Sequence, residues 1–148
     1  MRKLSLLAVI TFSVLLSGCS FTSDLVVMNL SDRPIEVRYR FKESPAPFSP
    51  DTKPATKPIA EISRDYAWHE LSPDRYVVGS HTRTVTVTVA PKTALLVDSV
   101  NGYLRDDDSL RISEIMMRGA GGIVILQGAQ LRKSFVSETK QVYTISYK

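Results

Sequence analysis

The chain has 148 residues, of which 43% are hydrophobic and 23% charged, and its formal net charge is +4. A chain of this length suits one domain that buries a core of its own. Its basic residues are spread along the sequence and it has a single cysteine, so neither a nucleic-acid footprint nor an internal disulfide is expected.

The first residues have the layout of an export signal. Arg2 and Lys3 form a short positive region, and residues 4–16 are apolar apart from three small polar side chains. The apolar run has about 13 residues, whereas a helix that spans a membrane needs roughly 20. Residues 1–18 are therefore predicted to be a signal peptide.

The segment ends in Leu16, Ser17, Gly18 and Cys19. This sequence is similar to the lipobox of bacterial lipoproteins, in which a branched residue and two small ones precede an invariant cysteine. The resemblance implies a diacylglyceryl group on the sulfur of Cys19, cleavage between Gly18 and Cys19, and acylation of the new amino terminus. The alternative is an ordinary secretory signal in which the cysteine occurs by chance.

The residues after the cysteine predict where the anchored chain lies. Ser20 follows Cys19 where inner-membrane lipoproteins often carry Asp, so we expect the periplasmic face of the outer membrane. Residues 19–24 form a short lipidated tether, and residues 25–148 form the domain. Arg2 and Lys3 are two of the 19 basic residues, so 17 remain against 15 acidic ones and the mature chain is nearly neutral.

The domain sequence alternates apolar and polar residues with a period of two, which is typical of half-buried strands. The clearest segments are residues 35–42, 84–89 and 142–147. Further strands are expected at residues 24–30, 76–79, 93–100, 110–117, 123–127 and 130–137. No segment predicts an amphipathic helix.

Turn residues separate these segments at short, regular intervals, as at Asn101-Gly102 and residues 119–122. The pattern predicts an all-β fold, either a sandwich or a small barrel. We favour a single antiparallel β-sandwich of about 7–9 strands, immunoglobulin-like or transthyretin-like. The cysteine pair of true immunoglobulin domains is absent.

A proline-rich stretch covers residues 43–58 and holds five of the eight prolines. Because proline lacks a backbone donor, a helix or central strand is excluded, and an extended loop is expected. Long loops are often functional. One interpretation is a docking loop with Phe48 as its anchor, and the other is an insertion between strands.

A second expected loop, residues 64–74, carries Tyr66, Trp68 and His69. Aromatic side chains with a polar group are enriched where surfaces meet partners or sugars. Tyr66 and Trp68 are therefore candidate partner-binding residues. The alternative is that Trp68 caps the end of the core.

Other motifs are weaker. The acidic residues 106–108 lack the spacing of a calcium loop, and the glycines of residues 119–122 lie between two strands rather than before a helix. His69 and His81 have no metal-ligand spacing. No catalytic residue, metal or cofactor is expected.

These features predict a lipid-anchored, non-catalytic binding or accessory module for another envelope protein, which it contacts through its loops or an exposed edge. The alternative is a lipoprotein that binds a glycan or small ligand or acts as an inhibitor. A lipid-anchored enzyme is a third, less favoured hypothesis.

Overall fold

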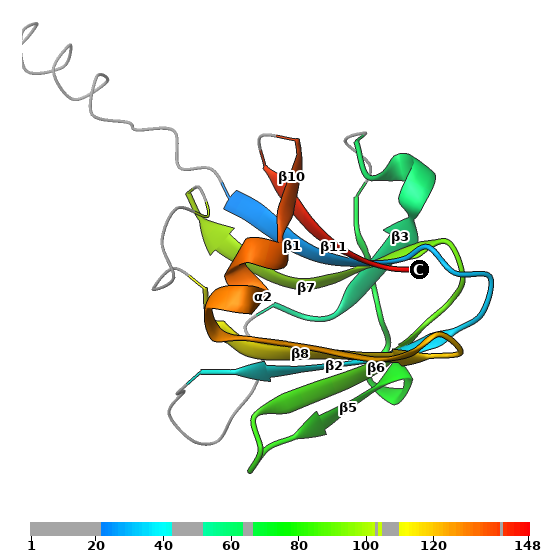
Figure 1. Ribbon diagram of the computed structural model, residues 1–148, viewed down its shortest axis with the longest axis horizontal. Coiled ribbons are helices and arrows are strands. Elements are labelled where there is room, and N and C mark those ends of the chain that lie inside the picture. The colour runs from blue at the N-terminus through cyan, green and yellow to red at the C-terminus, as the bar shows by residue number, and fades with distance from the viewer. Residues whose placement is uncertain (1–21, 43–51, 64–66, 103, 105–109, 140) are drawn as a thin grey trace, which may run out of the picture.

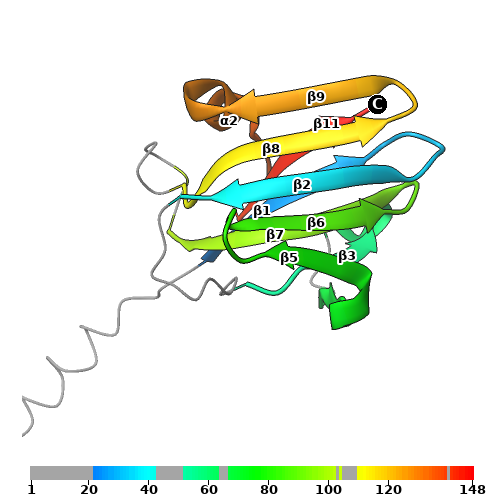
Figure 2. The same ribbon diagram turned by 90° about the horizontal axis from the view of Figure 1, so that it is seen from below.

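The computed structural model describes residues 22–42, 52–63, 67–102, 104, 110–139 and 141–148. Within these residues eleven strands form two separate sheets, joined by two short 3-10 turns and one α-helix. Figure 1 shows the sheets lying one above the other as two layers, and Figure 2 shows the five-stranded sheet in front of the six-stranded one. The described part of the chain is therefore all-β in class, as the alternating pattern predicted.

The five-stranded sheet is antiparallel throughout. Its strand order is β5 (Tyr76–Gly79), β6 (Thr84–Val89), β2 (Ile35–Phe41), β8 (Ile112–Gly119) and β9 (Gly122–Gln127). Along β2, Val37 and Tyr39 are fully buried, whereas Arg38 and Arg40 point to the other face. Burial on one face only explains the period of two in this sequence.

The six-stranded sheet has the order β10 (Val136–Thr139), β11 (Val142–Tyr147), β1 (Thr22–Asn29), β7 (Thr93–Asn101), β3 (Ala55–Pro58) and β4 (His69–Glu70). β1 and β11, the first and last described strands in chain order, lie side by side and pair in parallel. The other pairs of this sheet are antiparallel. The sheets are therefore mainly antiparallel, as expected, with this one parallel pair, and the described residues form eleven strands where about 7–9 were expected. Short edge strands, and pairing between strands from the two ends of the domain, leave no pattern in the nearby sequence.

The main core lies between the two sheets, and each sheet supplies one face of it. Leu25, Val27, Leu95 and Val97 come from the six-stranded sheet, and they face residues of the other sheet such as Val37. Helix α2 (Gly128–Ser134) packs against β8 and β9 and places Leu131 in this core. Burying such side chains contributes roughly 1.5–3 kcal/mol each.

One predicted strand is a helix. Residues 130–137 were expected to be extended, but α2 occupies most of them and only β10 follows. Gly128 opens the helix at a φ of 51°, a value that glycine adopts readily. Because Leu131 is the only buried residue of this short helix, the sequence shows no helical period.

Three segments that were expected to be loop or tether are strands. β3 lies at the end of the proline-rich stretch, and β4 lies in the second aromatic loop. β1 begins at Thr22, so residues 22–24, which we assigned to the tether, are part of the sheet.

The turn at residues 119–122 is confirmed, because Gly119 pairs with Gly122 in the β8–β9 hairpin. Among the described residues, no helix is long and apolar enough to cross a membrane.

Candidate binding surface

Four of the five residues singled out from the sequence lie outside the described residues. These are Gly18 and Cys19 at the predicted lipidation site, Phe48 in the proline-rich stretch, and Tyr66 in the second loop. Trp68 is described, immediately before β4. Its surroundings therefore decide how much of the predicted aromatic site the structure supports.

Trp68 lies on the outer face of the six-stranded sheet, where its N–H group and its aromatic ring both contact other side chains. Its Nε1–H donates to Oδ2 of Asp24 at 2.8 Å, and Nζ of Lys57 lies 4.2 Å from the ring centroid. Ser99 Oγ donates to the other oxygen of Asp24 at 2.8 Å. The indole is thus held by neighbours from β1 and β3, through a charge-assisted hydrogen bond and a cation–π contact.

The indole also packs on a second, smaller hydrophobic cluster on this outer face. Its buried members are Val26, Met28, Ala55, Ile62, Ala94 and Leu96. The chain that covers them includes the turn Ile59–Glu61 and Trp68 itself. Trp68 therefore caps a core, as one of the two interpretations held, although this core lies outside the sheets and not between them.

The two histidines do not form a site with the described residues around them. His69 is exposed on β4, and His81 is exposed in the turn between β5 and β6. In the part of the chain that the structure describes, no group of three His, Cys, Asp or Glu side chains lies close enough to hold a metal ion. The acidic residues 106–108 lie outside that part.

An ion pair lies at one end of the main core. The carboxylate of Asp98 on β7 is fully buried and accepts hydrogen bonds from Nε (3.1 Å) and Nη2 of Arg111. Thr52 Oγ1 lies 3.3 Å from the same carboxylate. Burying a carboxylate is tolerated when it is paired and hydrogen-bonded in this way, so the group is satisfied and structural.

Tyr39 lies in the same interior with its hydroxyl buried and without a hydrogen-bond partner among the described residues. Burial raises the pKa of this hydroxyl far above its ordinary value, and the negative charge of Asp98 raises it further. The group therefore stays neutral at any physiological pH, which makes it a poor base or nucleophile.

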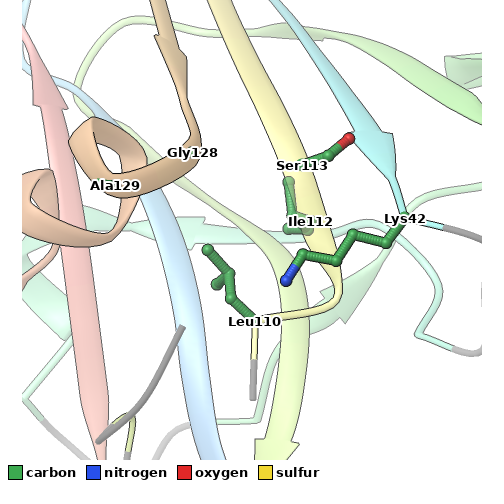
Figure 3. A pocket seen from close by; sticks show the side chains of 6 residues that line it. All are labelled: Lys42, Leu110, Ile112, Ser113, Gly128 and Ala129. Carbon is green, nitrogen blue, oxygen red and sulfur yellow. The ribbon is translucent and has the colours of Figure 1, made fainter. Parts of the chain in front are cut away.

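Two small cavities open near this end. The first has a volume of about 170 Å³, and Figure 3 shows the amine of Lys42 reaching between Leu110 and Ile112 toward the start of α2. Ser113 also lines it, but its hydroxyl is directed away from the amine and donates to the Arg40 carbonyl at 3.2 Å. The serine and the lysine therefore do not form a nucleophile–base pair.

The second cavity, of about 240 Å³, lies beside Arg111 and is lined by Ser99, Val100 and Asn101. Its charged group, Arg111, is already paired with Asp98. Neither cavity reaches the size that encloses a drug-sized ligand, about 300 Å³ or more.

The feature that the sequence did not single out is the edge of the five-stranded sheet. Strand β9 forms this edge, at the end opposite β5 (Figure 2). Three consecutive large apolar residues on it are solvent-accessible, namely Ile123 at 57%, Val124 at 39% and Ile125 at 49%. An exposed, apolar and unpaired edge of this kind is a template for pairing with another strand.

The other three edge strands are protected in the ways that natural sheets use. β4 has only two residues, and one of them is Glu70. β10 has four residues, includes Glu138 and has an irregular register beside β11. β5 also has only four residues. β9 has six residues, GIVILQ, and none is charged, so it is the one long and unprotected edge of the described sheets.

The middle of the outer face of this sheet is polar, and Val77 on β5 is exposed at the opposite edge. Oε1 of Glu114 lies 3.6 Å from Nη2 of Arg38 and 3.8 Å from Nη2 of Arg40, and Glu114 also accepts a hydrogen bond from Gln127. These contacts pair Glu114 with the charged side chains in the middle of the face, where Nε of Arg38 has no hydrogen-bond partner among the described residues. The large apolar residues exposed on this face lie at its two edges, one on β5 and two, Ile123 and Ile125, on β9.

The described residues define an all-β domain of two sheets with one open apolar edge. Comparisons of the chain with protein families, with curated proteins and with solved structures find no match.

Proposed function

We propose that the chain is a lipid-anchored protein of the cell envelope. It acts as a non-catalytic binding or accessory module for another envelope protein, and β9 is its contact surface. The observation that carries this proposal is the open edge of β9, where three adjacent large apolar residues are exposed on an uncharged strand. We further propose that the two sheets form an immunoglobulin-like or transthyretin-like sandwich.

An open edge of this type fits binding by strand addition. Backbone N–H and C=O groups of the edge strand pair with an extended strand of the partner, and side chains on alternate positions add specificity. In an antiparallel ladder, alternate residues of β9 direct both backbone groups away from β8. Hydrogen bonds to the partner and burial of Ile123 and Ile125 would then act together.

The anchor proposal rests on the resemblance of residues 16–19 to a lipobox. β1 begins at Thr22, three residues after Cys19. Three extended residues span at most roughly 10 Å. Lipid on Cys19 would therefore hold the domain against the membrane, on the periplasmic face of the outer membrane if Ser20 acts as a sorting residue.

Binding of a glycan or small ligand by Trp68 has less support. A sugar-binding indole needs an accessible ring face and, often, a free N–H, whereas Trp68 has Lys57 over its ring and Asp24 on its N–H. An enzymatic role has no supporting arrangement among the described residues. The open edge favours a protein partner.

The proposal is tested by placing a photoreactive residue at Ile125 in the full chain, irradiating intact cells, and identifying adducts by mass spectrometry. The matched control carries the same residue at Thr86, which lies on the same outer face but in the middle of the sheet. We expect one protein to be captured at Ile125 and not at Thr86. Absence of any protein adduct at Ile125, or equal capture at both positions, would contradict the proposal.

The anchor is tested separately with Cys19→Ser. We expect the wild-type chain to incorporate radiolabelled palmitate and to fractionate with the outer membrane, and the variant to lose both properties. Incorporation that persists in Cys19→Ser would exclude this cysteine as the lipidated residue.

A further inference from the structure

We infer that the protein that pairs with β9 is a second copy of this chain, added antiparallel to β9 across a two-fold axis at Val124. The inference rests on the proposed use of β9 as a contact edge and names the partner. It joins two five-stranded sheets into one continuous sheet.

The exposed sequence of β9 is symmetric. Ile123, Val124 and Ile125 read the same in both directions. When two such strands run antiparallel with Val124 opposite Val124, each Ile123 lies opposite Ile125 of the second copy. A two-fold interface requires a surface that is complementary to itself, and this segment meets that requirement.

Pairing of β9 with its own copy places matching residues on the same face of the joined sheet. Residues directly opposite one another in an antiparallel pair lie on the same face of the sheet. In the β8–β9 pair, Ile123 lies opposite Arg118, and Ile125 lies opposite Met116. In the proposed register the exposed isoleucines of both copies meet on the outer face, while the two Val124 side chains meet on the inner face beside Met117.

The charges on and beside β9 also permit self-pairing. Like charges directly opposite one another destabilise a strand pair, and charged residues are the usual device that blocks self-pairing. β9 has no charged residue. Across the joined sheet, Arg118 lies beside Ile123 of its own copy, and the next residues in the same line are Ile125 and Met116 of the second copy. Self-pairing thus brings no like charges together. The corresponding pairing of β10 would bring Glu138 of each copy to the interface.

The size of the contact indicates where pairing occurs. A ladder of about five residues extends only roughly 17 Å and buries less than the roughly 1,200 Å² of a standard stable interface. We therefore expect a weak pair in dilute solution. On a membrane, anchoring raises the effective concentration of one copy near another, which favours the same pair without new contacts.

The test is disulfide trapping of Val124→Cys in the full chain. A residue on the two-fold axis lies opposite its own copy at about 4.5–5.5 Å between Cα atoms, within the range that a disulfide bridges. Ile125→Cys is the matched control, because the same register separates its two copies by roughly 8 Å, which is too far. Cells are treated with a mild oxidant, and dimers are quantified on non-reducing gels, with the wild-type chain as the baseline for Cys19.

We expect Val124→Cys to give roughly tenfold more dimer than Ile125→Cys, because only the former meets disulfide geometry. Co-expression of Ile123→Cys with Ile125→Cys should also give a disulfide-linked dimer, because these two positions lie opposite one another in the proposed register. This mixed pair tests the register if the Val124→Cys protein fails to accumulate. Equal trapping of Val124→Cys, Ile125→Cys and a cysteine at the remote, exposed Val77 would indicate random collision and overturn the inference.

The outcomes also separate this inference from the proposed function. If neither Val124→Cys nor the mixed pair forms a dimer, but the photoreactive residue at Ile125 captures a different envelope protein, β9 is a contact edge and the second copy is wrong as its occupant. If neither method finds a partner, both proposals fail. A dimer at Val124 together with capture of the same chain at Ile125 supports β9 as a contact edge and the second copy as its occupant, and it contradicts a different envelope protein at this edge.

Discussion

The outer faces of the two sheets differ in how their apolar residues are treated. On the six-stranded sheet, the chain itself covers Val26 and Leu96 with the turn Ile59–Glu61 and the indole of Trp68. On the five-stranded sheet no such covering lies over the described residues, and Ile123 and Ile125 remain exposed. Trp68 thus completes the protein's own surface where we expected a partner, and the uncovered apolar residues Ile123 and Ile125 lie on an edge strand.

The largest expected effect comes from charging the covered face. Val26→Asp buries a carboxylate without a partner, so we expect it to destabilise the fold by about 4 kcal/mol or more. Thr86→Asp places the same carboxylate on the uncovered face, opposite Arg38, and should change the unfolding free energy by less than about 0.5 kcal/mol. Urea unfolding measures both. Similar losses for the two variants would contradict the distinction between the faces.

Replacing one large side chain on each outer face by alanine compares the two faces directly. Trp68→Ala removes the cap, its hydrogen bond to Asp24 and the contact with Lys57, so a loss of about 2 kcal/mol is expected. Ile125→Ala should cost less than about 0.5 kcal/mol, because Ile125 is half exposed. Trp68→Phe should leave capture at Ile125 unchanged. A loss of capture in that variant, with the fold intact, would restore Trp68 as a partner-binding residue.

The interior that both sheets share gives a smaller effect with a pH signature. Tyr39→Phe removes a buried hydroxyl that lacks a partner among the described residues, so we expect it to stabilise the fold by about 1 kcal/mol at pH 8. Burial, reinforced by Asp98, raises the pKa of Tyr39 in the folded state. Above pH 10 the unfolded chain releases this proton and the folded chain keeps it, so stability falls as the pH rises.

This fall approaches about 1.4 kcal/mol per pH unit for one such group and should be absent from Tyr39→Phe. Chemical unfolding of both proteins between pH 8 and pH 11 isolates it, because the other titrating groups are common to the two chains. Parallel pH profiles would show that Tyr39 does not titrate differently in the folded and unfolded states.

The sequence predicted those strands whose two faces differ in burial. β2, β6 and β11 were found because one face is apolar and the other polar, as in the alternation of Val85, Val87 and Val89 with threonines. The apolar run of β9 was also expected to be a strand. Its exposure was not predictable, because Ile123 to Leu126 resembles a strand buried on both faces until the strand order places it at an edge.

The parallel pairing of β1 with β11 joins residues more than a hundred positions apart and leaves no local pattern. The covered face was missed for a related reason. Trp68 finds Asp24 and Lys57 only after β1, β3 and β7 have assembled, so an aromatic loop residue that caps a core cannot be told from one that awaits a partner by sequence alone.

Ile125→Lys has the smallest expected effect on folding and the largest on pairing. The side chain is half exposed, so the free energy of unfolding should change by less than about 0.5 kcal/mol. Two lysines brought into the β9 contact repel one another and block a strand pair. Dimer trapping in the Val124→Cys background should therefore fall to the level of the Ile125→Cys control. Undiminished trapping would contradict the proposed register.

The most direct test of the contact edge is amide hydrogen exchange along β9 in the full-length protein reconstituted in membranes. We expect the amides of Ile123 and Ile125 to be protected clearly more than those of the edge strand β5, and to become fast-exchanging when Ile125→Lys is introduced. If alternate β9 amides exchange as fast as those of the edge strand β5, with or without the substitution, the edge is unpaired and the account is wrong.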